Sequence, residues 1–380
     1  MPDPLSPPSP PSPPSAPSAV TPASAPTLRC PLGTAPAVPA EVVEDAVTWT
    51  VSRAGPARDG VELEARADGA ADVRAGRWTP EGGVALLPPG RDRRLPALEH
   101  ARREGAVIVH RPGRRAVVRA ADGGSFLKVL RPQAAAAVSA AHRSAGVFAA
   151  GFDLPRILER ADDPAGLVRF SALPGRTVLE VGSDPRTTED EWSALWERWA
   201  AGWALLPAAP AELPEHGSEA EAAVVARWAA HAAPLLVPAA RAEVLAAAER
   251  VAESLLGAPA EPLVLAHRDL HDKQLLVAGD ALALLDLDTA ARAEAALDLG
   301  NLRAHLRLRT AQGLLAADDA ARARAVVDRA AERAGASPER LAVYETAARF
   351  RLACLYLFRP AWRSSAARAL TRTAGRILSA

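Results

Sequence analysis

The sequence predicts an α+β fold in which a small antiparallel sheet precedes a larger helical part. Three strand-like segments separated by Pro-Gly and Asp-Gly-Gly turns predict the sheet: 107–111, 115–120 and 125–130. Helical periodicity dominates after Pro174 and is clearest in residues 189–206, where four tryptophans at spacings of 4, 3 and 4 fall on one face. With 380 residues, of which 49% are hydrophobic, the chain can bury a sizeable core.

The remaining elements follow from composition and periodicity. Residues 41–95 mix short strand-like stretches with Gly and Pro, and a short helix is expected at 95–104. An Ala-rich helix is expected near 133–145, and a strand pair that ends at 167–173 follows it. A short β-rich island, 263–287, interrupts the later helices. Those helices are expected at 219–232, 239–256, 316–334, 338–358 and after Trp362.

Three regions differ in composition. Residues 1–40 contain 14 of the 34 prolines, and such a segment cannot bury enough apolar surface to offset the entropy of ordering. We therefore expect a disordered Pro/Ser-rich tail there. Residues 41–173 are expected to form an N-terminal lobe with an N-terminal extension. Residues 174–380 are expected to form a helical C-terminal lobe that carries the β-rich island.

Charge and cysteine content exclude several classes of protein. Lys+Arg and Asp+Glu both total 45, and this zero net charge argues against non-specific nucleic-acid binding, which needs a basic excess. Two cysteines, Cys30 and Cys354, cannot make a disulfide scaffold, so a reducing cytoplasmic location is expected. No uncharged apolar run reaches the roughly 18 residues of a membrane span. The N-terminus also lacks the pattern of a signal peptide. The oligomeric state is left open.

The β-rich island carries the polar residues that suggest chemistry. It reads LVLAHRDLHDKQLLVAGDALALLDLD, with Asp269 two residues after His267, the amide Gln274 five residues further on, and Asp286 after a hairpin. A hairpin with carboxylate and amide groups at both ends brings them together at one point. Phosphoryl transfer needs such a set, because one carboxylate orients the attacking hydroxyl while a second carboxylate and an amide oxygen hold magnesium against the nucleotide phosphates.

This pattern resembles the catalytic and metal loops of the aminoglycoside phosphotransferase/choline kinase-like family. The family pattern is H-x-D-x-x-x-x-N, followed by a hydrophobic run that ends in Asp. The resemblance implies that Asp269 is the catalytic aspartate, that Asp286 is a magnesium ligand with Gln274, and that Lys128 in SFLKVL holds the α/β-phosphates of ATP. It also implies a two-lobed protein-kinase-like fold, with a small antiparallel-sheet N-lobe, a helical C-lobe and ATP bound between them.

The same resemblance assigns further residues to the site. Lys273, four residues after Asp269, is expected to act on the transferred phosphoryl group, since some kinases are similar in carrying a basic residue there. Gly113 and Arg115 at the tip of the first hairpin are expected to contact the nucleotide phosphates, with a solvated turn as the alternative for Arg115 and its neighbours Arg111 and Arg114. The linker 169–173, which includes Ser171, is expected to offer hydrogen bonds to the adenine.

The sequence departs from the family pattern at two places. Gln274 replaces the usual Asn and keeps the amide oxygen one methylene further out; bacterial maltokinases are similar in this respect. The helix after Lys128 has no acid between Gln133 and Val147, where family members usually place a Glu that pairs with the lysine. His142 lies near the expected place but is not an equivalent anion, so the partner of Lys128 is not identified.

Several nearby residues have two interpretations. His267 is expected to hold the loop rather than act as a base, and Asp298 is expected to brace the loop. Asp288 is a second metal ligand, a substrate contact or a solvated carboxylate. His271 is a surface residue or a substrate contact. The tryptophan face is expected to be core, with an aromatic wall for a substrate ring as the alternative.

The scarcity of lysine is a further indication. The chain has only two lysines, Lys128 and Lys273, and otherwise uses arginine for positive charge. Each lysine therefore indicates a place where a compact ammonium is needed instead of a planar guanidinium.

Together these features predict ATP- and Mg²⁺-dependent phosphorylation of a hydroxyl group on a small molecule. The alternatives are a maltokinase-like sugar kinase and a nucleotide-binding regulator without transfer activity. A protein kinase is disfavoured, because the chain runs from Asp286 to Asp298 without a long activation segment. The acceptor is not identified. A cationic drug would need a cluster of acids near Asp269. Asp272 and Asp288 form only part of such a cluster.

Overall fold

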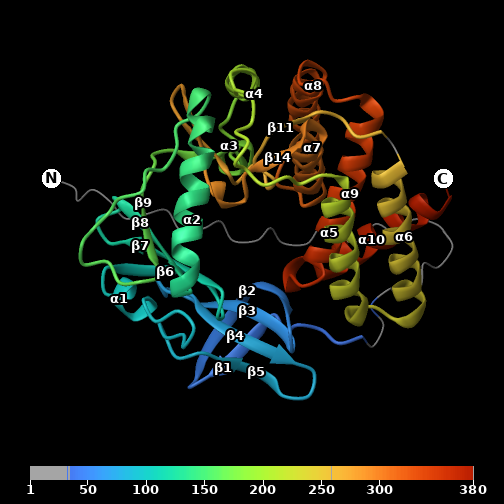
Figure 1. The fold of residues 1–380 in the computed structure, drawn as a ribbon. Coiled ribbons are helices and arrows are strands. Elements are labelled where there is room, and N and C mark those ends of the chain that lie inside the picture. The colour runs from blue at the N-terminus through green and yellow to red at the C-terminus, as the bar shows by residue number, and fades with distance from the viewer. Residues whose placement is uncertain (1–31, 33–34, 258, 380) are drawn as a thin grey trace. The chain divides into compact units, whose positions relative to one another are not determined.

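The computed structural model describes residues 32, 35–257 and 259–379. Its first part is a five-stranded antiparallel sheet in which each strand pairs with the next along the chain (Figure 1). The strands are β1 Glu41–Glu44, β2 Val47–Ala57, β3 Gly60–Ala67, β4 Arg74–Thr79 and β5 Gly83–Leu86. The sequence predicted only scattered strand-like stretches here, because Gly, Pro and Arg interrupt the period-2 pattern that identifies a strand.

A second, four-stranded antiparallel sheet has the order β6-β7-β8-β9. Its strands are β6 Gly105–Arg111, β7 Arg115–Ala120, β8 Ser125–Leu130 and β9 Leu167–Ser171. The three predicted strands are therefore confirmed. The strand pair expected before residue 173 is wrong: β9 is one strand, and residue Ile157 adds only an isolated bridge to Phe170. One face of the sheet packs on α1 (Leu98–Arg102) in a separate apolar core.

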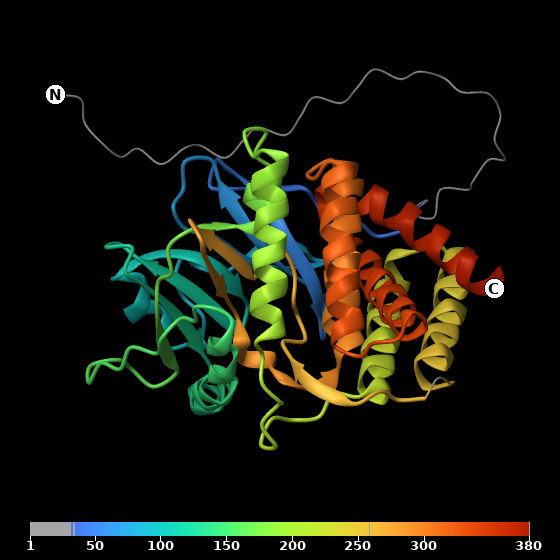
Figure 2. The same ribbon diagram turned by 90° about the horizontal axis from the view of Figure 1, so that it is seen from above.

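The helices predicted from periodicity are present. They are α2 Pro132–Ser144, α4 Glu189–Ala204, α5 Ser218–Ala232, α6 Pro238–Gly257, α8 Ala317–Arg333, α9 Pro338–Tyr356 and α10 Arg363–Ser379. The short helix α3 (Val178–Gly182) was not predicted. Helix α4 lies alongside α8 (Figure 2), and Trp192 Nε1 donates to Asp319 O at 2.9 Å. Trp192, Trp196 and Trp199 are buried in the main core, as the sequence favoured. No helix among the described residues combines the length and apolarity needed to cross a membrane.

One long helix, α7 (Ala295–Ala311), was not predicted. Twelve of its 17 residues are buried, including Asp298, Asn301 and His305. A helix that is covered on nearly every side has no polar face, so it lacks the amphipathic period by which helices are recognised. It packs against α9 and α8, and it begins directly after β14 (Ala291–Glu294).

The β-rich island is built from short antiparallel pairs. Strand β11 (Leu263–Ala266) pairs with β14, and β12 (Leu275–Ala278) pairs with β13 (Ala281–Leu284) across the predicted turn at residues 279–280. Strand β10 (Arg176–Thr177) adds to the other edge of β12. The segment between β11 and β12 and the segment after β13 are therefore held at neighbouring ends of these pairs.

The five-stranded sheet and the helices pack around the same hydrophobic core. Val51, Ala54 and Leu63 belong to the same buried cluster as the tryptophans of α4 and the apolar residues of α9 and α10. Most of the predicted tail lies outside the described residues. Its last part packs on the helices, since Val38 is 4% exposed and Arg363 donates to Pro36 O at 2.6 Å. The divisions proposed at residues 40 and 173 stay predictions.

Helices α7 and α9 are in tight contact at Gly300, which yields a stability prediction. A Cβ there would lie 2.8 Å from Glu345 N and 3.0 Å from Tyr344 C. Overpacking costs about 1–3 kcal/mol, which exceeds the roughly 1 kcal/mol that alanine gains over glycine in a helix. Gly300→Ala is therefore expected to lower the free energy of unfolding, measured by urea denaturation.

The control is Gly375→Ala in α10, where no heavy atom lies within 4 Å of the new Cβ. This variant should be as stable as the parent or up to about 1 kcal/mol more stable. Equal stabilities for both variants would mean that α7 and α9 can separate at no cost.

Candidate active site

The catalytic loop follows β11 and is held by a buried carboxylate. Asp298, at the start of α7, is 1% exposed and accepts hydrogen bonds from the amides of His267 (2.6 Å) and Arg268 (2.8 Å). The His267 ring is fully buried and bonds Leu285 O at 2.7 Å through Nε2. Its Nδ1 accepts from the Asp269 amide at 3.3 Å. These contacts fit the expected structural roles of Asp298 and His267, because both residues fix the loop backbone.

The Asp269 side chain is left accessible by this arrangement. It is 45% exposed, and the ionisable group that lies within 4 Å of it among the described residues is the His271 imidazole, with Nε2 at 3.9 Å. The residue before it, Arg268, has a φ of 69°, and Asp286 has a φ of 57°. Left-handed backbone at a residue other than glycine is costly and is concentrated at functional sites, where the surrounding structure enforces it.

The metal loop brings Gln274 and Asp286 to the same end of the β12–β13 hairpin. Leu275 is paired with Leu284, and the Leu285 amide donates to Gln274 O at 2.9 Å. Gln274 therefore lies opposite the residue that precedes Asp286. Its side-chain amide makes no hydrogen bond with any described residue, so a carboxylate and an amide oxygen are both available for a hard cation.

Lys128 connects the four-stranded sheet to the metal loop. Its side chain is 9% exposed, and its ammonium contacts Asp286 at 3.0 Å and also Asp288. Arg115 Nη1 lies 3.7 Å from the other oxygen of Asp286. Burial alone would raise the pKa of Asp286, but the charges of Lys128 and Arg115 outweigh it and hold the pKa below its usual value. Asp286 is therefore ionised at neutral pH.

The partner of Lys128 is thus an acid of the metal loop and not of the helix. Helix α2 has no carboxylate, and its His142 is buried with Nε2 2.7 Å from Pro155 O. Asp288, two residues after Asp286, occupies the role that a helix glutamate would have. Of the three interpretations of Asp288, a freely solvated carboxylate is wrong, because the side chain is 16% exposed and bonded to Lys128.

The tip of the β6–β7 hairpin is held by hydrogen bonds with residues outside the hairpin. The Gly113 amide donates to Asp92 Oδ2 at 2.5 Å, and Arg131 Nε donates to Gly113 O at 2.7 Å. Asp92 also lies 3.2 Å from His110. Gly113 has a φ of 64°, which the Pro-Gly turn requires. The amide assigned to a nucleotide phosphate is therefore already bonded to Asp92, whereas Arg115 does face the metal loop.

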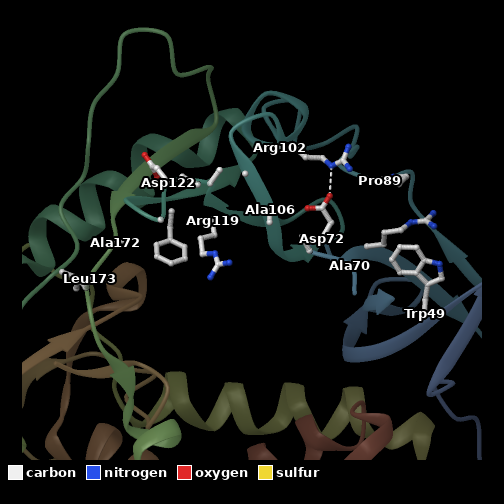
Figure 3. A pocket seen from close by; sticks show the side chains of 17 residues that line it. Trp49, Ala70, Asp72, Pro89, Arg102, Ala106, Arg119, Asp122, Ala172 and Leu173 are labelled. Atoms are coloured by element: carbon white, nitrogen blue, oxygen red, sulfur yellow. Dashed lines mark hydrogen bonds and ion pairs between the residues drawn. The ribbon is translucent and has the colours of Figure 1, made fainter. Parts of the chain in front are cut away.

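A cavity of about 880 Å³ lies beside the four-stranded sheet (Figure 3). Ala172 and Leu173 line one end, and Trp49 lines the other. Phe126 also lines it, and Lys128 lies two residues further along β8 on the same face, about 7 Å away. The volume is typical of a small-molecule site. The lining combines apolar residues with the charged side chains of Arg74 and Arg119, and Lys128 itself is not part of it.

Ser171 does not line this cavity. Its amide donates to Arg156 O at 2.8 Å, and its hydroxyl accepts from the Arg156 amide at 2.9 Å. Of the predicted linker, the two residues after Ser171 are the ones placed at the cavity. The neighbouring strand end accounts for this, since Ser171 is the last residue of β9 and still pairs with Ser125.

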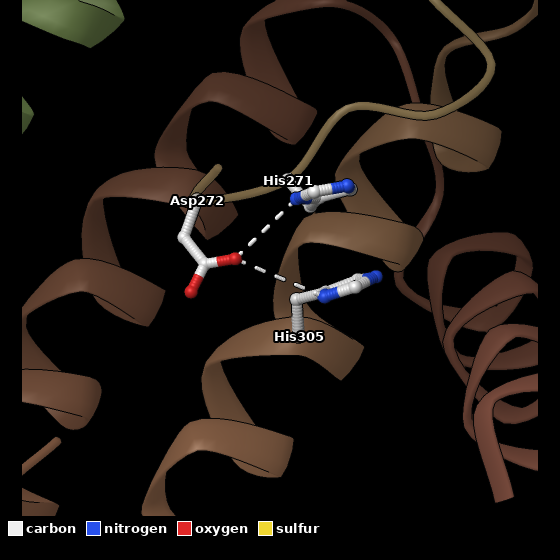
Figure 4. Close-up of side chains that lie close together, drawn as sticks. All are labelled: His271, Asp272 and His305. Carbon is white, nitrogen blue, oxygen red and sulfur yellow. Dashed lines mark ion pairs between the residues drawn. The ribbon is translucent and has the colours of Figure 1, made fainter. Parts of the chain in front are cut away.

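Two residues of the catalytic loop form a cluster with a residue of α7 (Figure 4). The three residues are His271, Asp272 and His305. The imidazole rings stack at 4.4 Å, and Asp272 lies 3.4 Å from His271 and 3.9 Å from His305. Both oxygens of Asp272 also accept from Arg309, at 2.6 and 3.1 Å. Burial would raise the pKa of Asp272, but the hydrogen bond with His271 and then the bidentate pair with Arg309 hold this pKa well below its usual range. Because Arg309 already compensates the carboxylate, we assign the cluster to loop support and not to a metal.

Lys273 follows Asp272 and is exposed. Its amide donates to His271 Nδ1 at 3.1 Å, but its ammonium has no carboxylate within 4 Å among the described residues. Partial removal from water and then the charge of Arg309 lower the pKa of Lys273. The Lys273 ammonium is therefore a positive charge of the catalytic loop without an ion pair among the described residues, on the side of Arg309 and Tyr356.

The fold gives the structural class of the chain, and a match to a known protein family gives its family. The fold is mixed α+β with antiparallel sheets. The chain belongs to the phosphotransferase enzyme family, which it matches over residues 111–336, more than half of its length. The predicted enzyme class, a small-molecule kinase or phosphotransferase with an alcohol group as acceptor, is confirmed at this level. A comparison with curated proteins found no match.

Solved structures give further similarities. A macrolide 2'-phosphotransferase from Brachybacterium faecium is 20% identical, with coverage of 67% of this chain and 87% of that one and a TM-score of 0.39. An aminoglycoside phosphotransferase from Streptomyces rimosus is also 20% identical, with coverage of 65% and 91% and a TM-score of 0.42. A glucosamine kinase is 18% identical, with coverage of 87% and 94% and a TM-score of 0.45.

Proposed function

We propose that this chain is an ATP- and Mg²⁺-dependent phosphotransferase that phosphorylates a hydroxyl group of a small molecule. The observation that carries the proposal is the contact of Lys128 with Asp286 and Asp288. A basic residue of the sheet and the acids of the metal loop meet at one point, where a nucleotide phosphate would need both a cation and a metal. We further propose a two-lobed protein-kinase-like arrangement, with the four-stranded sheet and the helices on either side of the nucleotide.

Each residue has a distinct role in this proposal. Asp286 and Gln274 would hold Mg²⁺, since a lowered carboxylate pKa and an unbonded amide suit a hard cation. When bound, the metal neutralises charge on the phosphates. Lys128 and Arg115 would bind phosphate oxygens, and the base would occupy the cavity beside Phe126 and Leu173.

The transfer itself asks for positioning more than for covalent chemistry. The acceptor oxygen forms a bond to the γ-phosphorus, the bond to the β–γ bridging oxygen breaks, and ADP leaves. Asp269 accepts the proton of the acceptor hydroxyl. Lys273, four residues later in the same loop, would compensate charge on the transferred group.

The metal loop can be tested by Asp286→Ala. Removal of this carboxylate is expected to weaken Mg·ATP binding by about 10–100-fold, because one of the two protein ligands is lost. Calorimetric titration of Mg·ATP measures the affinity, and ATP consumption over a panel of hydroxylated metabolites measures turnover.

The matched control is Asp280→Ala at the opposite end of the same hairpin. The Asp280 side chain is 97% exposed, and its one ion pair among the described residues is with Arg198. It should bind Mg·ATP like the parent. If Asp286→Ala also retains its affinity and turnover, the metal loop is misassigned.

A polycationic acceptor is not supported by the acids near Asp269. Asp272 is paired with Arg309, and Asp288 is paired with Lys128. Neither carboxylate is free to bind an ammonium group. A sugar kinase remains the second candidate, and the observation that favours it is Gln274 at the family's Asn position.

A further inference from the structure

Four charged side chains near the catalytic loop have no partner among the described residues. They are Arg53 of β2, Glu64 of β3, Lys273, and Arg359 after α9, and none forms a side-chain hydrogen bond or an ion pair there. Glu64 is 6% exposed with Oε1 buried, and Arg359 Nη1 is buried as well. A buried charge without a partner costs free energy, so such a group indicates a place for a polar ligand.

Contacts along the chain place these four groups together. Arg309 bonds Asp272 of the catalytic loop and, through Nη1, the hydroxyl of Tyr356 at 3.1 Å. The Arg359 amide in turn bonds Tyr356 O at 3.0 Å. The turn Pro360–Trp362 that follows packs against β2, the strand of Arg53. The end of α9 therefore joins the catalytic loop to the five-stranded sheet.

Electrostatic effects agree with this placement. Burial first, and then the charge of Arg53, lower the pKa of Arg359 to about 10. Burial raises the pKa of Glu64, although Arg53 and Arg359 oppose the shift. Each group thus lies within reach of the charge of another, yet none is close enough to bond.

The balance of charge around this place is positive. Three cations, Arg53, Lys273 and Arg359, face one carboxylate, Glu64. Of the other acids, Glu62 is paired with Arg114 at 3.4 Å and Asp272 with Arg309, and Asp269 is the carboxylate assigned to the acceptor hydroxyl. An anion would satisfy the unpaired guanidinium groups, whereas a cation would add to their repulsion.

We propose that the acceptor carries an oxyanion, a carboxylate or a phosphate ester, in addition to the hydroxyl that is phosphorylated, and that Arg359 and Arg53 bind this oxyanion. The inference rests on the proposed function, because it places the acceptor at the loop of Asp269 and Lys273. Guanidinium groups present a planar set of donors that matches both kinds of oxyanion. Glu64 accepts a hydrogen bond from a further hydroxyl of the same molecule.

These specificity residues come from outside the part that matches the family. The match covers residues 111–336, whereas Arg53 and Glu64 precede it and Arg359 follows it. The five-stranded sheet and the end of α9 would then select the acceptor, and the matched part would supply the phosphoryl-transfer machinery.

The test uses the full chain and two sets of probes that differ in charge. One set is glucose, glucuronate, glucose 6-phosphate and glucosamine; the other is glycerol, glycerate and glycerol 3-phosphate. Titration of Mg·ATP comes first, and its failure would count against the proposed function alone. The probes are then titrated calorimetrically with and without a non-hydrolysable Mg·ATP analogue, which keeps them out of the nucleotide site.

An acidic member of at least one set is expected to bind about tenfold or more tightly than the neutral member of its set, and in the glucose set also more tightly than glucosamine. Arg359→Gln should remove this preference, Arg359→Lys should keep part of it, and all variants should bind Mg·ATP like the parent. Arg372→Gln, an exposed arginine of α10, is the matched control and should change nothing. The carboxylate and phosphate arms show which oxyanion is preferred.

Two results would overturn the inference. One is neutral or amino probes that bind as tightly as the acidic ones. The other is an equal loss of affinity for neutral and acidic probes in Arg359→Gln, which would mean that the residue only supports the fold. If Arg359→Gln melts early, Arg53→Gln is measured in the same way and decides between the same outcomes.

Discussion

Asp269→Asn is expected to slow phosphoryl transfer by about 10²–10⁴-fold while Mg·ATP binds almost unchanged. The substitution removes the proton acceptor but keeps the size of the side chain. The carboxylate is 45% exposed and makes no hydrogen bond with the described residues, so the fold does not depend on it. Single-turnover rates with the best acceptor, together with calorimetric titration of Mg·ATP, separate the two effects.

A matched control for this variant is Asp318→Asn, at an exposed position at the start of α8. It should retain the rate of the parent. Transfer within about threefold of the parent in Asp269→Asn would remove Asp269 from the mechanism, because that change is far below the range for a positioned acid or base.

Sequence periodicity predicted the elements that have one polar and one buried face. Helix α4 is capped by Thr188, whose hydroxyl accepts from the Glu191 amide in a capping box, and its tryptophans recur at helical spacing. Helix α7 could not be found in this way because it is buried on nearly all sides. The five-stranded sheet was only partly visible for the opposite reason: its strands expose residues such as Val43 and contain Pro56, which interrupts the alternation.

In the candidate site, residues that lie close together in the sequence could be predicted, whereas contacts between residues far apart in the sequence could not. The loop residues Asp269, Gln274 and Asp286 lie within 18 residues of one another, and a hairpin between them is visible in the sequence. The partner of Lys128 lies 160 residues away. The missing acid of α2 signalled that a substitute was needed, but only the packing of β8 against the metal loop identifies it as Asp288. The pairing of Gly113 with Asp92 is of the same kind.

The group formed by Arg53, Glu64 and Arg359 could not be predicted from the sequence. None of the three belongs to a motif, and each comes from a different element. The sequence showed only that seven arginines and no acids follow Glu345. A run of this kind is ordinarily a solvated helix face, and nothing local in the sequence marks Arg359 as different from the other arginines. The burial of Arg359 Nη1 without a hydrogen-bond partner is a property of the packing.

Lys128→Met is expected to lower kcat for transfer by about 10²–10³-fold and to raise the KM for ATP, since it removes a positioned positive charge from the phosphates. Asp288→Asn should have a smaller effect, because Asp288 orients the ammonium without touching the nucleotide.

The double variant, Lys128→Met with Asp288→Asn, then distinguishes the remaining roles of Asp288. If Asp288 acts only through Lys128, the double variant is no slower than Lys128→Met alone, because the two effects are not independent. If the effects add, Asp288 has a role of its own as a metal ligand or substrate contact. Steady-state kinetics on the three variants, with thermal melting to show that each is folded, decides between these outcomes. A Lys128→Met variant with the kinetics of the parent would mean that the ion pair to Asp286 is structural and that the nucleotide lies elsewhere.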